Sequence, residues 1–383
     1  MKKILYLHAG AELYGADIVL LELLKGLDKS KFEPYVILPN EGPLVEKLIE
    51  NNIKVEVINY PILRRKYFNP LGIIKYIKDY IIYSNKLIKI AKDKKIDIVH
   101  TNTAAVLEGM FVKRRLKLKQ IWHIHEIIVK PKFMNKLLSY FISKNSDEVI
   151  TVSNAVKKHL LETGFFKENS IKVIYNGVDN KIFNSENNTK YLREEFNIPQ
   201  DALVVGMIGR VNAWKGQQDF LEAMDIVLEN KENVYAMLVG GVFEGEEWRI
   251  NQLNIKINSM KNKDKVIFSE YRNDTKNIHA LYDIFVLPST NPDPLPTVVL
   301  EAMASRTPIV GYKHGGICEM VEDGVNGSLA EVKNINALAE QILKFINDDV
   351  EREKSANESQ KRQKFMFSLE SYIENFESIY SEV

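Results

Sequence analysis

The sequence predicts two doubly wound α/β domains in one chain. Short runs of apolar, largely β-branched or aromatic residues alternate with helical patterns, as in a parallel sheet covered on both faces. The alternation stops once, at a polar stretch rich in Asn and Lys (176–188), and then restarts. The 383 residues, 45% of them hydrophobic, are also enough to build two cores. Together these observations favour repeated βα units on either side of a linker.

The first domain is expected to span residues 1–181. Its strands are predicted at 4–7, 35–38, 55–58, 98–101, 120–124 and 148–152. Helices are predicted at 16–27 and 153–162, and Ser153 is a typical N-cap for the second of these helices.

The second domain is expected to span residues 182–365. Its strands are predicted at 204–208, 235–239, 266–268, 284–287 and 308–311, and terminal helices at 334–346 and 365–380. The C-terminal segment 366–383 is expected to return to the first domain. Because doubly wound sheets bind ligands beyond the carboxyl ends of their strands, we expect the chemistry in strand-to-helix loops and in one cleft between the domains.

The charge is unevenly distributed along the chain. The net charge is +1, which gives no case for nucleic acid as a partner. Residues 1–183 carry 31 Lys and Arg against 19 Asp and Glu, a net of +12, whereas the remainder carries 21 against 32, a net of −11. Basic clusters at 113–119 and 64–66, and the amphipathic stretch 73–95, suit either an anionic membrane surface or ordinary solvated helices.

Cysteine content and hydropathy bear on the cellular compartment. Cys318 is the single cysteine, so no intramolecular disulfide is possible and a reducing compartment is expected. No apolar run reaches the roughly 18 residues of a membrane-spanning helix. We therefore expect a cytoplasmic protein, with peripheral attachment to the inner face of the membrane as a further hypothesis.

Several common motifs are absent. No GxGxxG follows a predicted strand, and the GxxxxG spacing of Gly10 and Gly15 lacks the lysine of a phosphate-binding P-loop. There is no GxSxG elbow and no D-x-D pattern for a divalent cation. His123 and His125 lack a third ligand at a recognisable spacing, so we expect neither a metal site nor a bound cofactor.

The segment 285–303, FVLPSTNPDPLPTVVLEAM, contains the strongest functional pattern. A strand leads into a proline-rich loop with Asp293, and a helix is predicted to begin near Thr297 with Glu301 one turn in. Free amides at a helix start bind anions, Asp293 is placed for sugar hydroxyls and Glu301 for a ribose diol. The structural alternative is that Asp293 caps a turn and Glu301 lies in a solvated first turn.

This segment resembles the Glu-x7-Glu signature of retaining glycosyltransferases of the GT-B fold, in particular glycosyltransferase family 4. Asp293 stands where the first Glu is usual and Glu301 is the second. Pro296 replaces a common Gly and has no N–H, so the amides of Leu295 and Thr297 are left to serve. Further segments resemble the family's phosphate loop and its Gly-Gly loop: they contain Gly209, Arg210 and Lys215, and Gly315 and Gly316.

The first domain carries two weaker resemblances to the same family. Tyr14 to Asp17 resembles the Gly-Gly-Ala-Glu loop after the first strand, and places Gly15 at a helix start. WHIHE (122–126) places His125 where the family has a strand-end histidine. A satisfied loop histidine is the alternative interpretation of His125.

The resemblance implies metal-independent, retaining transfer of a hexosyl or N-acetylhexosaminyl group from a UDP- or GDP-sugar to a polysaccharide, lipid-linked or similar acceptor. It implies catalytic roles for His125, Asp293, Arg210 and Lys215. It implies donor binding by Gly15, Gly209, Arg210, Lys215, Asp293, Leu295, Thr297, Glu301, Gly315 and Gly316. A GT-B-type UDP-sugar 2-epimerase and a non-catalytic nucleotide-sugar binding protein remain alternatives.

Overall fold

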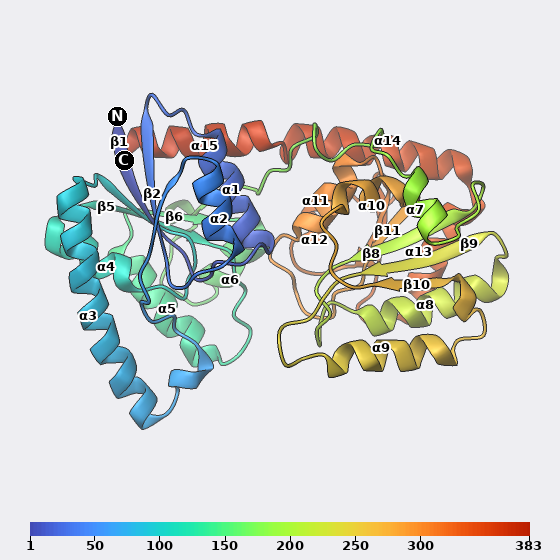
Figure 1. Cartoon of the computed structure of the whole chain (residues 1–383), viewed down its shortest axis with the longest axis horizontal. Helices are drawn as coiled ribbons and strands as arrows, with labels where there is room; N and C mark the ends of the chain where they lie inside the picture. Colours follow the sequence, from blue (N-terminus) through green and yellow to red (C-terminus); the bar gives the residue numbers. More distant parts are fainter. The chain divides into compact units, whose positions relative to one another are not determined.

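The computed structural model describes residues 1–383 and divides into two compact units. Residues 1–177 and 369–383 form the first unit, and residues 178–368 form the second. Each unit contains one parallel sheet with helices on both faces (Figure 1). The predicted architecture of doubly wound α/β domains is therefore confirmed.

The first unit contains a seven-stranded sheet in the order β3-β2-β1-β4-β5-β6-β7. Its strands are β1 (Lys2–Leu7), β2 (Phe32–Leu38), β3 (Lys54–Val57), β4 (Ile98–Thr101), β5 (Lys119–Ile124), β6 (Glu148–Thr151) and β7 (Lys172–Val173). The chain winds outward from β1 in one direction and then returns to continue from β4 in the other. The winding direction therefore reverses between β1 and β4, which form the topological switch point of the sheet. The loops that follow these two strands diverge to opposite faces and leave space between them.

Alternating side chains of β1 enter two separate cores. Ile4 and Tyr6 pack with α1 (Gly15–Gly26), α2 (Pro43–Glu50) and α15 (Leu369–Glu382). Leu5 and Leu7 pack on the other face with α3 (Pro70–Lys94) and α4 (Glu108–Leu116). The remaining helices are α5 (Lys132–Asn145) and α6 (Asn154–Leu161). The predicted N-cap is confirmed, because the Ser153 hydroxyl accepts a hydrogen bond from the Val156 amide.

The C-terminal helix α15 completes the core of the first unit. Phe376 and Tyr380 are fully buried against the sheet. The Tyr6 hydroxyl donates to the Tyr380 oxygen at 2.9 Å, and the Tyr380 hydroxyl lies 2.8 Å from Nδ1 of His100. These hydrogen bonds give both buried tyrosine hydroxyls and Nδ1 of His100 a partner and connect residues 280 positions apart.

The second unit contains a six-stranded sheet in the order β10-β9-β8-β11-β12-β13. Its strands are β8 (Leu203–Ile208), β9 (Val234–Val239), β10 (Val266–Ser269), β11 (Ile284–Leu287), β12 (Ile309–Tyr312) and β13 (Gly327–Ala330). The winding direction reverses between β8 and β11, so the loops after these two strands border the switch point of this sheet.

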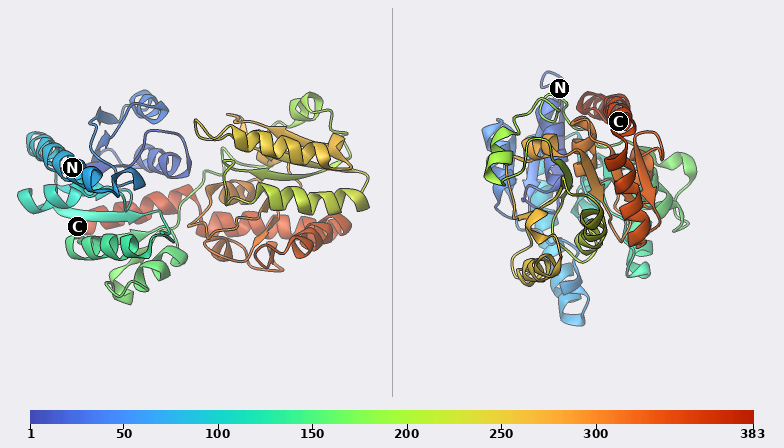
Figure 2. Two further views of the ribbon diagram at one scale, coloured as in Figure 1. Left: turned by 90° about the horizontal axis from the view of Figure 1, so that it is seen from below. Right: turned by 90° about the vertical axis from the view of Figure 1, so that its right-hand side faces the viewer.

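Helices cover both faces of the second sheet. On one face α8 (Gln217–Asn230) packs beside both α9 (Trp248–Ser259) and α13 (Ile335–Asn347) (Figure 2). α11 (Thr297–Ala304) packs with α10 (Thr275–Leu281), α12 (Ile317–Met320) and α14 (Asp349–Met366). The short helix α7 (Lys190–Glu195) precedes the sheet. No helix in either unit combines the length and the apolar character needed to cross a bilayer.

Three elements differ from the sequence-based predictions. The short strands β7 and β13 were not predicted. The segment before 365 is helical throughout α14, where no helix was predicted. The buried side of α14 consists of Ser355, Ala356, Ser359 and Gln363, so the helix has no apolar periodicity to reveal it.

His100 makes the stability of the first unit depend on pH. Burial lowers the pKa of His100 to about 3, whereas an unfolded histidine has a pKa of about 6.5. Because only the unfolded chain takes up this proton, the stabilising contribution is complete above about pH 6.5 and is lost as the pH falls. The unfolding free energy of the wild type should fall between about pH 7.5 and pH 5.5. In His100→Phe this fall should be smaller by about 1.4 kcal/mol. Urea titrations at both pH values measure this, and identical losses in the two proteins would contradict the assignment.

Candidate functional site

An ion pair lies at the switch point of the second sheet. Lys215 follows β8 and Asp293 follows β11, and Lys215 Nζ lies 2.5 Å from Asp293 Oδ2. Both side chains are largely buried. When no other charged group is bound, the attraction between the buried carboxylate and ammonium offsets the free-energy cost of removing both from water. The structure thus brings together two of the predicted site residues that are 78 positions apart.

Glycines allow the loops around this ion pair to touch. Gly216 has φ +86°, and a Cβ there would lie 1.9 Å from the carbonyl oxygen of Pro288. Gly315 has φ +68°, a conformation that favours glycine. The Gly316 amide donates to the Asp293 carbonyl oxygen at 2.7 Å, and a Cβ at Gly316 would clash with the Pro294 carbonyl. The loops after β8, β11 and β12 therefore form one continuous backbone surface.

Arg210 and a neighbouring cavity extend this surface. The guanidinium carbon of Arg210 lies 3.9 Å from the ring centroid of Phe243. A Cβ at Gly240 would lie 2.0 Å from the Gly209 carbonyl oxygen, so the loops after β8 and β9 also touch. A cavity of about 460 Å³ opens directly beyond, lined by Gly241, Val242, Glu244, Glu247, Ile250, Asn251, Glu270 and Tyr271.

Glu301 lies in a buried hydrogen-bonded pair. Helix α11 begins at Thr297, as predicted, after the N-cap residue Pro296 and the buried Leu295. Glu301 is 9% exposed, and its Oε2 lies 3.0 Å from Nε2 of the fully buried His279. The alternative interpretation of Glu301 as a solvated residue of the first turn is therefore wrong. The histidine holds one carboxylate oxygen and fixes the orientation of the side chain.

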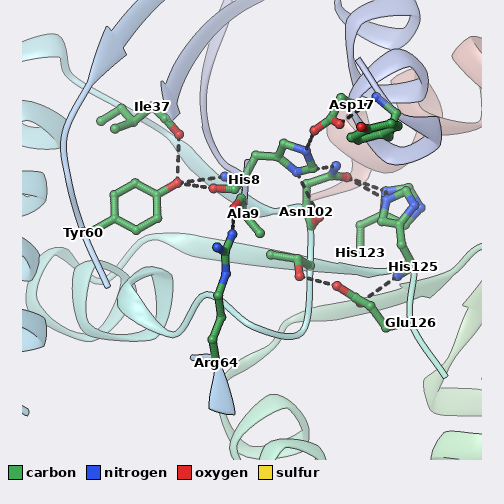
Figure 3. Close-up of polar contacts among 12 residues, drawn as sticks. His8, Ala9, Asp17, Ile37, Tyr60, Arg64, Asn102, His123, His125 and Glu126 are labelled. Carbon is green, nitrogen blue, oxygen red and sulfur yellow. Dashed lines mark hydrogen bonds and ion pairs between the residues drawn. The ribbon is translucent and has the colours of Figure 1, made fainter. Parts of the chain in front are cut away.

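The first unit has a polar network at its own switch point (Figure 3). His8 follows β1, Asn102 follows β4, and His125 follows β5. His8 Nε2 lies 2.7 Å from Asp17 Oδ1, and Asn102 Nδ2 lies 3.1 Å from His8 Nδ1. Asn102 Oδ1 lies 2.9 Å from His123 Nδ1 and 3.0 Å from His125 Nε2. Asn102 is therefore the centre of a network that joins all three histidines.

These contacts assign a tautomer to the neutral ring of His125. The Asn102 carboxamide oxygen only accepts, so His125 Nε2 carries a proton and donates to it. His123 Nδ1 faces both this oxygen and His125 Nε2, and His8 Nδ1 faces both the side-chain nitrogen and the carbonyl oxygen of Asn102. In this pattern Nδ1 of His125 keeps its lone pair, and no group of the chain binds it.

Burial keeps the rings of His123 and His125 uncharged. Burial, together with the neighbouring His8 and His100, lowers the pKa of His125 to about 3. Burial also lowers the pKa of His123 well below its usual value. Burial raises the pKa of the Glu126 carboxyl, against hydrogen bonds from the Thr103 hydroxyl and from two backbone amides. The imidazoles therefore act as neutral hydrogen-bonding groups near neutral pH.

The loop before α1 is tied to the same network. Helix α1 begins at Gly15, as the Tyr14–Asp17 segment predicted. The Tyr14 amide donates to Asp17 Oδ2 at 3.0 Å, while Asp17 Oδ1 accepts from His8. Asp17 thus connects the helix start that contains Gly15 with the network that contains His125.

Comparison with protein families agrees with this geometry. Residues 14–181 match the family model described as Glycosyltransferase Family 4, and residues 188–363 match the model described as Glycosyl transferases group 1. The chain belongs to the GT-B glycosyltransferases of the family 4 type.

Relatives of known activity resemble this glycosyltransferase over most of its length. The UDP-Gal:alpha-D-GlcNAc-diphosphoundecaprenol alpha-1,3-galactosyltransferase of Escherichia coli is 27% identical over 360 residues, which cover 88% of each chain. The N-acetyl-alpha-D-glucosaminyl L-malate synthase of Bacillus anthracis is 25% identical over 325 residues, 82% of each chain. The crystal structure of Anabaena HepE in complex with UDP and glucose has a TM-score of 0.86 and 26% identity, with all of both chains covered.

Three polar residues of the glycosyltransferase were missed by the sequence analysis. His8 and Asn102 stand immediately after β1 and β4, the two strands that flank the switch point. Their position after strands 4–7 and 98–101 was a usable signal, because these are the loops in which α/β sheets bind ligands. His279 lies inside α10 and had no such signal.

Substitution of Asn102 in the glycosyltransferase tests the tautomer assignment. The wild-type His125 ring is expected to stay neutral and protonated at Nε2 between about pH 5 and pH 8. Asn102→Leu removes the acceptor and should cost about 1–3 kcal/mol of unfolding free energy and mix the tautomers. Asn102→Asp keeps an acceptor and adds a charge, so it should raise the pKa of His125. ¹⁵N-edited NMR of the imidazoles measures both effects. A wild-type His125 that titrates near its ordinary pKa of about 6.5 would contradict the assignment.

Proposed function

We propose that this glycosyltransferase transfers a hexosyl or N-acetylhexosaminyl group from a UDP-sugar, with retention of configuration and without a metal ion. The proposed acceptor is a lipid-linked sugar or a polysaccharide, and a GDP-sugar is the alternative donor. The observation that carries the proposal is the buried pair of Lys215 and Asp293 at the glycine-lined switch point of the second sheet, with Arg210 in the same loop after β8. UDP is favoured because HepE, similar in fold over its full length, was crystallised with UDP and with UDP-glucose.

The diphosphate is the group that these cations suit. Arg210 is permanently charged and can bind two phosphate oxygens at once, and Lys215 supplies a compact point charge. The start of α11 adds amides and the positive end of a helix dipole, although Pro296 itself has no N–H. These groups stabilise the negative charge that develops on the departing diphosphate, which is the task that a divalent cation otherwise performs.

The nucleobase and the ribose are assigned to two different places in the second unit. The cavity beyond Gly240 lies beside the Gly209–Arg210 loop and has the size and the aromatic wall, from Tyr271, that a nucleobase requires. In this proposal Glu301 accepts hydrogen bonds from the ribose hydroxyls. Its partner His279 holds Oε2, so Oε1 is available for the ribose.

Asp293 and His125 are assigned to the sugars. Asp293 is paired with Lys215 in this structure, and in the proposal it turns to the hydroxyls of the transferred sugar when the diphosphate takes over Lys215. His125 accepts a hydrogen bond from a sugar hydroxyl through Nδ1, the nitrogen that Asn102 leaves unprotonated. The leaving phosphate receives the acceptor proton, since the donor loops offer no obvious general base.

Two variants separate nucleotide binding from transfer. Glu301→Ala should weaken UDP binding by about 1–3 kcal/mol, because it removes a hydrogen-bonding partner of the ribose. Asp293→Asn should leave UDP binding intact or tighten it, because Lys215 loses its competing anion, and should lower the transfer rate. Calorimetry with UDP and a transfer assay measure the two effects. The exposed acid Glu331, changed to Ala, is the matched control. Unchanged UDP affinity in Glu301→Ala would contradict the ribose assignment.

A further inference from the structure

Helix α3 of the first unit exposes a continuous apolar strip to solvent. Ile73, Ile74, Ile77 and Ile81, here called the isoleucine strip, are between 48% and 66% exposed. Their spacing places them on one side of the helix. Of the 25 residues of α3, only Ser84, Leu87 and Ala91 are buried. Apolar surface of this extent on a soluble protein marks a contact with another molecule.

The strip lies at the part of α3 that is least covered by the rest of its unit. Figures 1 and 2 both show the N-terminal half of α3 extending beyond the sheet of the first unit. Leu71, in the first turn, is 79% exposed, and Phe68, just before the helix, is also exposed. The apolar surface therefore continues to the tip of this projection.

Unpaired cations border the isoleucine strip. α3 contains six Lys and two Asp. None of its exposed lysines forms an ion pair in the structure, and the same holds for the basic segment just before the helix: Lys75, Lys78, Lys86 and Lys89, and Arg64, Arg65 and Lys66. The cluster at 113–119 also contains cations outside ion pairs, Arg114, Arg115 and Lys117, although its Lys113 is paired with Asp147 at 2.7 Å. Around α3, such cations lie beside the isoleucine strip.

A helix with an apolar strip flanked by lysines has the pattern of an interfacial membrane helix. Long lysine side chains extend from the edge of such a strip to the headgroup phosphates while their methylene groups stay in contact with apolar surface. Each cation near an anionic surface attracts it more strongly at low ionic strength. An isologous contact with a second copy would instead bring the same lysines of two chains together, which is unfavourable.

We propose that α3 docks this glycosyltransferase on an anionic lipid bilayer. The isoleucine strip enters the headgroup region, and Lys75 and Lys78 contact the lipid phosphates. The inference does not depend on the identity of the donor sugar. It does explain how a lipid-linked acceptor reaches the first unit.

Vesicle cosedimentation of the full chain tests the proposal. One set of vesicles is pure phosphatidylcholine, and in the other about a third of the lipid is phosphatidylglycerol. The wild type should bind the anionic vesicles, and the binding should weaken as salt is raised. Ile74→Asp with Ile77→Asp, and separately Lys75→Glu with Lys78→Glu, should each lower the partition coefficient at least about tenfold.

Matched variants on the second unit control for non-specific effects. Ile255 is 70% exposed on α9, and Ile255→Asp should leave vesicle binding unchanged. Lys261→Glu with Lys263→Glu is the corresponding charge control. Circular dichroism and UDP affinity show whether each variant is folded.

Three outcomes would overturn the proposal. The first is wild-type protein that does not bind anionic vesicles at low salt. The second is binding that the α3 variants do not reduce relative to the Ile255→Asp control. The third is a lipid-free dimer, detected by light scattering, that Ile74→Asp with Ile77→Asp converts to a monomer, because this would show that a second copy covers the strip.

Discussion

The close contact of three backbone loops at the carboxyl edge of the second sheet is the constraint on which the proposed donor site depends. All six strands of this sheet are parallel, so their carboxyl ends meet at one edge. Gly216, Gly315 and Gly316 then let the loops approach to distances that no side chain would permit. The result is a surface of backbone with few side chains, on which Lys215 and Asp293 are held against each other. In the proposed function, the donor diphosphate replaces Asp293 as the partner of Lys215, and this exchange would couple donor binding to release of the carboxylate.

The carboxyl edge of the parallel sheet in the first unit carries a different set of side chains. Its switch point holds uncharged imidazoles rather than cations, because burial favours the neutral forms of His123 and His125. A neutral imidazole whose tautomer is set by Asn102 offers a defined acceptor to a hydroxyl group without attracting the donor's phosphates. Lysines outside ion pairs lie elsewhere in this unit, for example on the exposed side of α3. Charge and hydrogen-bonding specificity are thus separated within this unit.

The sequence predicted the architecture and most strands because buried parallel strands are compact apolar runs, as in β4 and β11, whose bounds were predicted without error. It did not predict α14, whose buried side is made of small polar residues. The candidate donor residues could be identified because they stand in motifs, and the helix start at Thr297 followed from the pattern. The partners of those residues could not be identified from the sequence. Lys215 with Asp293, Glu301 with His279, and His125 with Asn102 each join distant parts of the chain, and only the folded sheet order brings them together.

The central claim is that Lys215 and its neighbours, rather than a divalent cation, hold the donor diphosphate. Calorimetric titration of UDP in the presence of excess EDTA, into the wild type and into Lys215→Met, tests it most directly. The account predicts that the wild type binds UDP in EDTA and that Lys215→Met binds at least about tenfold more weakly, since a charged hydrogen bond of about 1.5–3 kcal/mol is lost. Binding that appears only when magnesium or manganese is added, or an unchanged affinity in Lys215→Met, would contradict it.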